Sequence, residues 1–115
     1  MRRVALATCS QVPELAPDDL LLLPALDACG IEGVPAVWDD PAVCWGEFEL
    51  VLVRSTWDYA ERRDAFLAWV GSLRRIENTV PVLECNTDKE RYLTDLERAG
   101  VQIVPTEFVP PGASF

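Results

Sequence analysis

The stretch FELVLVRSTWDY, residues 48–59, decides the fold. Its apolar run is rich in β-branched residues and contains no breaker, so it predicts a buried strand over residues 48–55. Polar and aromatic side chains follow at once, beginning with Arg54. In parallel α/β sheets, ligands bind beyond the carboxyl ends of the strands. This stretch therefore predicts both a central strand and part of a binding site.

Apolar runs and helical patterns alternate along the rest of the chain. Further strands are predicted over residues 2–9, 33–40 and 80–85. Helices are predicted over residues 18–30, 60–78 and 86–100, and residues 101–109 form a fifth strand or a strand that leads out. The pattern predicts a small, Rossmann-like, doubly wound α/β domain with a mainly parallel sheet and helices on both faces. It covers residues 1–104, and residues 105–115 form a proline-rich linker.

The first two helices carry terminal signals. Asp18 and Asp19 favour the start of the first helix, Pro24 makes it start late or kink, and Gly30 suits its end. Asp58 and Glu61 fit a capping box at the start of the second helix. Its apolar face is predicted to consist of Phe66, Trp69, Val70, Leu73 and Ile76.

The last helix is predicted to begin with Thr87 as its cap and Glu90 three residues later, and to end at Gly100. Its buried stripe is predicted to be Tyr92, Leu93, Leu96 and Ala99.

Composition excludes several classes of function. The 115 residues suit one domain, and the net charge of −9 argues against nucleic acid as a partner. No apolar run is long enough to cross a membrane or to act as a signal peptide, so we expect a cytoplasmic protein without a membrane partner. The four cysteines, Cys9, Cys29, Cys44 and Cys85, are expected to be reduced. The chain has no histidine, which removes Ser-His-Asp and Cys-His pairs and every His-containing metal site.

Four polar clusters follow predicted strands and should meet at one edge of the sheet. They are TCSQ (8–11), WDD (38–40), RSTWDY (54–59) and NTDK (86–89). Arg54 offers a fork of donors that matches a carboxylate, the hydroxyls of Ser55 and Thr56 lie beside it, and Trp57 offers a flat face. This set, with Asp58, could hold an amino-acid-like substrate. The alternative is structural: Arg54 pairs with Asp39, Asp40 or Asp58, Asp58 caps a helix, and Trp57 packs on a loop.

The remaining clusters also have two interpretations. Lys89, in the first turn of a helix, could bind a phosphate, or it could be a solvated side chain. WDD fits a turn better than a metal site, and Cys9 fits a small buried residue better than a nucleophile.

The segments PAVWDDPAV, ELVLVRSTWDYAERRDAFLAW and NTDKERYLTDLERAGVQIVPT carry a family likeness over roughly residues 4–110, and RSTWDY and NTDK occur within them in the expected order and spacing. The chain resembles the N-terminal region of ATP-grasp ligases of the glutathione synthetase and RimK-like type, in a bacterial set that includes cyclo-ligases for O-ureido-D-serine. The resemblance implies an ATP-dependent enzyme that activates a carboxylate as an acyl phosphate for attack by an amine.

In that family a lysine at the start of the linking helix reaches the nucleotide phosphates, and this role would fall on Lys89. Arg54, Ser55, Thr56 and Trp57 would face the substrate. The nucleotide-clamping fold, with its Mg²⁺ ligands, follows this region in the family. ATP and Mg²⁺ are therefore expected for a full-length parent that contains the ATP-grasp domain, and no cofactor and no activity for this chain alone.

Two other classes remain open. One is a stand-alone binding or regulatory module with a receiver-like fold, although its third strand should end in aspartate, where this chain has Arg54. The other is an interaction domain with Trp38, Trp45, Trp57 and Trp69 partly at an interface, and a homo-oligomer is also left open.

Overall fold

The computed structural model describes residues 2–113 and contains a four-stranded, all-parallel sheet in the order β2-β1-β3-β4. The strands are β1 (Arg2–Thr8), β2 (Ile31–Val37), β3 (Leu50–Ser55) and β4 (Ile76–Glu77). The α-helices are α1 (Leu22–Ala28), α2 (Arg63–Ser72), α3 (Val80–Asn86) and α4 (Lys89–Arg98). Short 3-10 helices are η1 (Asp19–Leu21), η2 (Trp45–Glu47) and η3 (Trp57–Glu61). The predicted α/β fold is confirmed.

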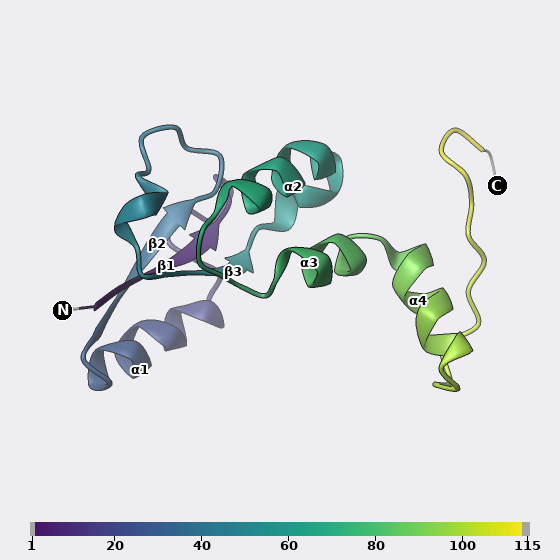
Figure 1. Ribbon diagram of the computed structural model, residues 1–115, viewed down its shortest axis with the longest axis horizontal. Coiled ribbons are helices and arrows are strands. Elements are labelled where there is room, and N and C mark those ends of the chain that lie inside the picture. The colour runs from purple at the N-terminus through teal and green to yellow at the C-terminus, as the bar shows by residue number, and fades with distance from the viewer. Residues whose placement is uncertain (1, 114–115) are drawn as a thin grey trace.

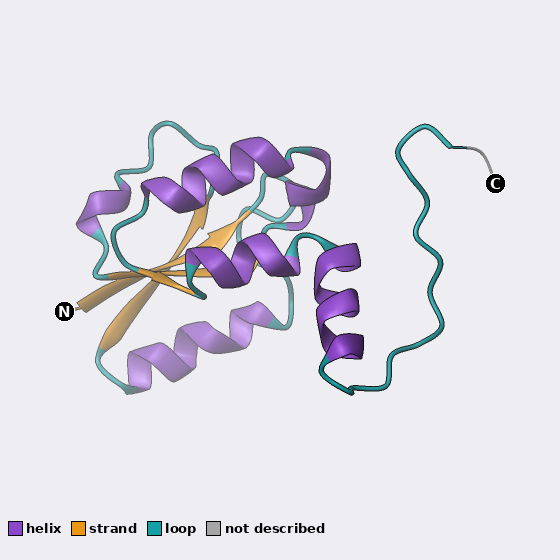
Figure 2. Ribbon diagram, turned by 45° about the vertical axis from the view of Figure 1, so that its right-hand side comes forward, coloured by secondary structure: helices purple, strands orange, loops and turns teal. Residues whose placement is uncertain are grey.

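Alternate side chains of the central strands feed two separate apolar layers, because successive residues of a strand point to opposite faces. Leu6 and Leu52 pack with residues of α1 on one face. Ala7 and Val51 pack on the other face with Trp69 from α2. Figure 1 and Figure 2 show the resulting layers, with α1 on one side of the sheet and α2 and α3 on the other.

The helix α1 begins late, as Pro24 predicts. A 3-10 turn precedes it, and Pro24 lies in its first turn, where the missing N–H has no intrahelical partner to lose. Gly30 ends it with φ +73°, a conformation that glycine adopts at little cost. Gly33 on β2 allows α1 to lie close, since a Cβ there would be 2.9 Å from Cδ1 of Leu26.

The predictions for residues 73–85 were wrong. Helix α2 ends at Ser72, and the backbone is extended from Leu73. The carbonyl of Arg75 accepts a hydrogen bond from the N–H of Val51, and Ile76 of β4 pairs with Val51 of β3. The predicted strand over residues 80–85 is the helix α3. A short apolar run does not distinguish a strand from a buried helix, and Pro81 is tolerated in a first helical turn.

Both predicted capping boxes were also wrong. The N-cap of α2 is Arg62, which makes no side-chain cap bond, because η3 precedes that helix. The helix α4 is capped by Asp88, whose carboxylate accepts the N–H of Arg91 at 3.1 Å. Thr87 instead ends α3, and its hydroxyl donates to the carbonyl of Leu83 at 2.9 Å.

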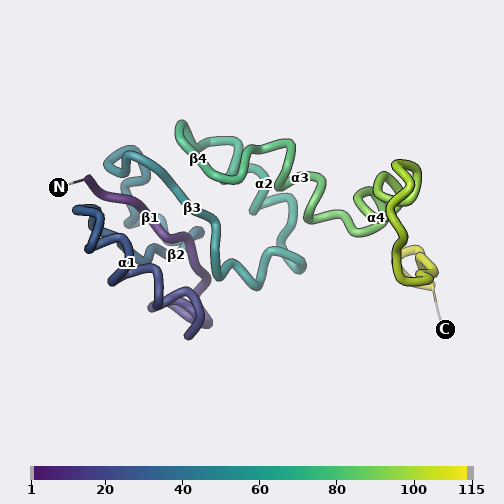
Figure 3. Tube along the Cα trace, turned by 90° about the horizontal axis from the view of Figure 1, so that it is seen from below, coloured from purple at the N-terminus to yellow at the C-terminus, as the bar shows by residue number. Residues whose placement is uncertain are grey.

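The C-terminal part stands away from the sheet, as Figure 3 shows. The predicted buried stripe of α4 was wrong, since none of its residues is buried. Residues 101–109 form no strand and are mostly exposed. Gly100, with φ +85°, follows the end of α4 as expected. Among residues 2–113, no helix combines the length and apolar character needed to cross a membrane.

Candidate functional site

Three of the four predicted polar clusters meet at the carboxyl edge of the sheet. Thr8, at the end of β1, lies opposite Val37 of β2 and Ser55 of β3. TCSQ, WDD and RSTWDY therefore follow neighbouring strand ends. The NTDK segment does not join them, because it connects α3 to α4 and follows no strand. The predicted position of residues 86–89 at this edge of the sheet was therefore wrong, because it depended on the predicted strand over residues 80–85.

The point between β1 and β3 is the topological switch point of the sheet. The chain leaves β1 toward α1 on one face and leaves β3 toward α2 on the other. The pairing of these strands is irregular between Ala7 and Thr8. Ligands of open α/β sheets bind at such a point, outside the carboxyl ends of the strands.

A cluster formed by Asp19, Arg54 and Ser55 fills this switch point, and we call it the Asp19 cluster. Arg54 donates from Nε and Nη2 to Oδ1 of Asp19, at 2.9 and 2.7 Å. Ser55 Oγ donates to Oδ2 of the same carboxylate at 2.5 Å. Arg54 can reach Asp19 because it lies on the α1 face of β3, as Leu50 and Leu52 do.

Asp19 is ionised within this cluster at neutral pH. Its burial, with 8% of the residue exposed, tends to raise the pKa of the carboxyl. Hydrogen bonds from Ser55 and Arg54, and the charge of Arg54, outweigh burial and lower that pKa below its ordinary value. The cluster therefore contains a buried carboxylate paired with a guanidinium whose side chain is 47% exposed.

The loop after β1 is attached to the same cluster. The N–H of Ala16 donates to Ser55 Oγ at 3.1 Å. The preceding residue, Leu15, is buried and has φ +81°, a left-handed conformation that is unfavourable for leucine. Thr8 Oγ1 donates to the carbonyl of Val12 at 2.6 Å. These contacts and the burial of Leu15 hold the strained loop against the end of β3.

A second cluster joins the end of β2 to the segment after β3. Asp58 accepts a hydrogen bond from Nε1 of Trp38 at 2.9 Å. Arg62 pairs with Asp39, and its guanidinium lies over the ring of Trp38, 4.8 Å from the centroid. Asp58 therefore anchors a buried indole and does not cap a helix.

The structure places the predicted site residues in different environments. Ser55 and Thr56 are buried, and Ser55 already has partners for its hydroxyl. Trp57 is 54% exposed at the start of η3, and Lys89 is exposed at the start of α4. The structural interpretation of Arg54 expected an ion pair with Asp39, Asp40 or Asp58, but the carboxylate that pairs with Arg54 is that of Asp19. Arg54 is thus the half-exposed cation that the fold fixes at the switch point.

Sequence reasoning missed Asp19 and Arg62 as members of these clusters. Asp19 was assigned to a helix start, although an aspartate after β1 and an arginine at the end of β3 are neighbours in this topology. All four cysteines are free, and Cys9 is buried in the core with Trp38. Within residues 2–113, no group of three or more Cys, Asp or Glu side chains is placed to hold a metal ion.

The chain is similar to proteins of cycloserine biosynthesis. DcsG of Streptomyces lavendulae, a cycloserine biosynthesis protein, is 40% identical over an alignment of 103 residues, and the match covers 84% of this chain and 34% of that protein. The crystal structure of D-cycloserine synthetase DcsG matches 96% of this chain and 38% of its own, with 36% identity and a TM-score of 0.85. The chain thus spans about a third of the length of these relatives.

Residues 4–83 also match the family described as the N-terminal domain of D-cycloserine synthetase DcsG. That range contains β2, β3, β4 and all but the first two residues of β1, together with the Asp19 cluster and the cluster around Trp38. It makes up more than half of the 115 residues. The chain therefore belongs to the family of DcsG N-terminal domains.

Proposed function

We propose that this chain is the substrate-binding N-terminal domain of an ATP-dependent ligase of the ATP-grasp type. Its substrate is an amino-acid-like molecule such as O-ureido-D-serine. The whole enzyme activates a carboxylate and forms a C–N bond, either between two molecules or within one molecule to close a ring. Family membership and the resemblance of residues 4–110 to ATP-grasp ligases support this assignment. We infer a cytoplasmic location, because the reaction consumes ATP.

The fixed position of Arg54 is the observation that carries the proposal. Asp19 occupies Nε and one hydrogen of Nη2, which leaves the outer part of the guanidinium free at the carboxyl edge of the sheet. An arginine held by a buried carboxylate loses little side-chain entropy when it binds a second anion. The carboxylate of an amino-acid-like substrate suits this donor, and exposed Trp57 offers it a flat apolar surface.

Lys89 is the residue of this chain that we assign to the nucleotide. It begins α4, is exposed, and forms no ion pair with any residue in the range 2–113. A free ammonium at a helix start fits a phosphate group, although Asp88 beside it adds a negative charge. ATP with Mg²⁺ would supply the phosphoryl group that activates the carboxylate, and other parts of the enzyme would bind most of it.

Exposed apolar residues support a further domain as the partner of this one. They gather on α4 and the segment after it: Leu96, Val101, Val104, Phe108 and Val109. Figure 1 shows both segments standing off from the sheet, so no core within residues 2–113 covers these side chains. Since the chain spans about a third of its relatives, we assign this surface to the ATP-grasp domain.

A chimera tests the proposed function. This chain replaces the matching N-terminal third of DcsG from Streptomyces lavendulae, and D-cycloserine formation from O-ureido-D-serine and ATP is measured. We expect ATP-dependent product from the chimera, and none from DcsG that lacks the segment. A folded chimera that binds ATP but forms no product would contradict the assignment. No observation favours the receiver-like module, and three of the four tryptophans, Trp38, Trp45 and Trp69, pack together in the domain.

A further inference from the structure

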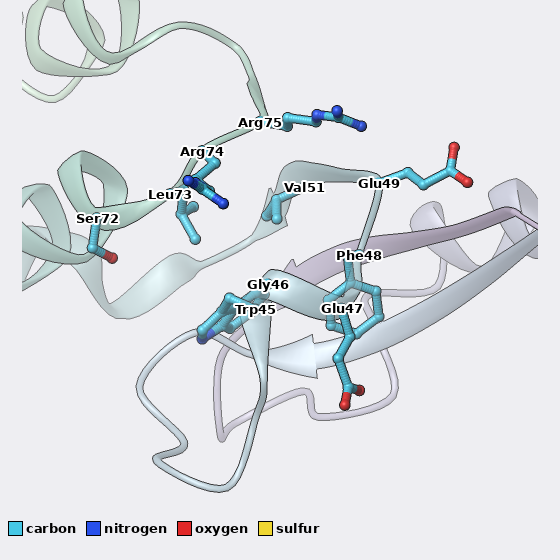
Figure 4. A pocket seen from close by; sticks show the side chains of 10 residues that line it. All are labelled: Trp45, Gly46, Glu47, Phe48, Glu49, Val51, Ser72, Leu73, Arg74 and Arg75. Carbon is cyan, nitrogen blue, oxygen red and sulfur yellow. The ribbon is translucent and has the colours of Figure 1, made fainter.

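A pocket of about 380 Å³ lies at the amino-terminal edge of β3, at the opposite end of the sheet from the Asp19 cluster. One wall comes from η2 and the residues after it, and the other from the end of α2 and the residues that lead into β4. Figure 4 shows the two walls facing each other across Val51. The lining residues that matter here are Trp45, Phe48, Val51, Leu73, Arg74 and Arg75. The volume is within the range of small-molecule sites.

The aromatic wall of this pocket, formed by Trp45 and Phe48, packs against neighbouring side chains. The ring of Trp45 lies 5.0 Å from Trp69 in an edge contact and 6.1 Å from Phe48. The guanidinium of Arg3 lies over the ring of Phe48, 5.2 Å from its centroid. Both Trp45 and Phe48 are only half-buried, so part of each ring remains available to a ligand. A preformed apolar surface of this kind lowers the cost of ordering a site when a flat molecule binds.

Within the part of the chain that the structure describes, the two glutamates that line the pocket have ionic partners, and the two arginines do not. Glu47 and Glu49 lie within 3.8 Å of Arg3 and Arg2. Arg74 and Arg75, in contrast, are exposed and have no acidic partner among residues 2–113. In Figure 4, the side chain of Arg74 turns toward the space between Leu73 and Trp45, whereas that of Arg75 extends away from this space, so the Arg75 guanidinium reaches a ligand there only after its exposed side chain rotates.

Two guanidinium groups beside an aromatic wall match a specific chemistry. A guanidinium binds a carboxylate with paired hydrogen bonds, and the rings accept an apolar body. Arg74 and Arg75 are the cationic residues that line the pocket, and together they can supply the donors for one carboxylate. We propose that this pocket binds a small organic acid, in which a single carboxylate is attached to a flat apolar body. The carboxylate pairs with Arg74 and Arg75, and the body lies against Trp45 and Phe48.

The test is an NMR titration of the 115-residue chain with 3-phenylpropionate, following the indole N–H signals. We expect saturable binding with a dissociation constant on the order of 1 mM or lower, and a shift of the Trp45 signal that exceeds that of Trp57 at the other edge. Phenylethylamine keeps the ring but reverses the charge, and acetate keeps the charge without the ring. Each should bind at least about tenfold more weakly.

Variants separate the proposed contacts from bulk charge. The double variant Arg74→Gln, Arg75→Gln should weaken 3-phenylpropionate binding at least about tenfold, whereas Arg98→Gln on α4 removes the same kind of charge elsewhere and should leave it unchanged. The proposal is overturned by the absence of saturation at about 20 mM, by equal binding of phenylethylamine, or by equal effects of the two sets of substitutions.

Discussion

Replacing Asp19 by alanine should destabilise the domain far more than the same change at its neighbour. Asp19→Ala removes a carboxylate that accepts two hydrogen bonds from Arg54 and one from Ser55. Asp18, one residue earlier, is exposed and makes no side-chain cap bond. The pair of variants therefore changes the same residue type at adjacent positions, and only one of them breaks the Asp19 cluster.

The magnitude follows from the burial of each partner. Removing one member of a buried ion pair costs about 3–5 kcal/mol, mainly because the other charge is left unpaired. Arg54 is 47% exposed and can be hydrated again, so we take the lower end, about 3 kcal/mol. For a domain of this size that is a fall in Tm of roughly 12 °C. Asp18→Ala should change stability by no more than about 0.5 kcal/mol.

Urea unfolding followed by circular dichroism measures both variants. A double-mutant cycle with Arg54→Ala should give a coupling free energy of at least about 1 kcal/mol, because Arg54 and Asp19 are in direct contact. Similar unfolding free energies for Asp19→Ala and Asp18→Ala, or additive effects in the cycle, would refute the structural role of this carboxylate.

Three further outcomes are expected. Asp19 has a lowered pKa in the folded state, so the stability that its ionised carboxylate contributes is present above the pKa of an unfolded aspartate and is lost as pH falls through the folded-state pKa. The difference in Tm between the unmodified chain and Asp19→Asn should therefore shrink in acid. A difference in Tm that stays constant with pH would contradict this. Lys89→Met should leave the Tm of this chain unchanged or slightly higher, because the ammonium is exposed at a helix start, and should slow the ATP-dependent step of the chimera by about tenfold; an unfolded variant with normal ATP kinetics would show a structural role. Under the proposed function the Mg²⁺ ligands belong to the ATP-grasp domain, so the purified chain alone should hydrolyse no ATP, and hydrolysis above a heat-killed control would contradict this.

Much of the fold was predictable because local patterns agree with the packing. β1 and β3 each contain an unbroken apolar run, and Phe66 and Val70 lie one helical turn apart on the buried face of α2. Residues 76–86 were not predictable in this way. Their short apolar runs suit either a strand or a helix, and tertiary contacts decide between them. Ile76 pairs with the edge of β3, whereas Leu83 packs into the core from helix α3.

The candidate site was predictable at the level of strand ends but not of partners. Arg54 follows a strong strand signal, so its place at the carboxyl edge could be read directly. Its partner Asp19 is 35 residues away, and the bond between them depends on η1 preceding α1 on the same face. Asp58 looked like a helix cap because its spacing to Glu61 fits one, yet the indole of Trp38 is the donor that it satisfies. Such pairings depend on tertiary contacts, which the spacing of residues along the chain does not encode.

The Michaelis constants of the Arg54→Ala chimera test the assignment of this domain to the substrate most directly. If the outer part of the guanidinium binds the substrate, its loss removes charge-assisted contacts of roughly 1.5–3 kcal/mol, and the KM for O-ureido-D-serine should rise at least about tenfold. The KM for ATP should change less than about threefold. Because the substitution also leaves Asp19 unpaired, the assay is run well below the measured Tm. An unchanged KM for O-ureido-D-serine, together with a lowered Tm, would show that Arg54 serves only the Asp19 cluster.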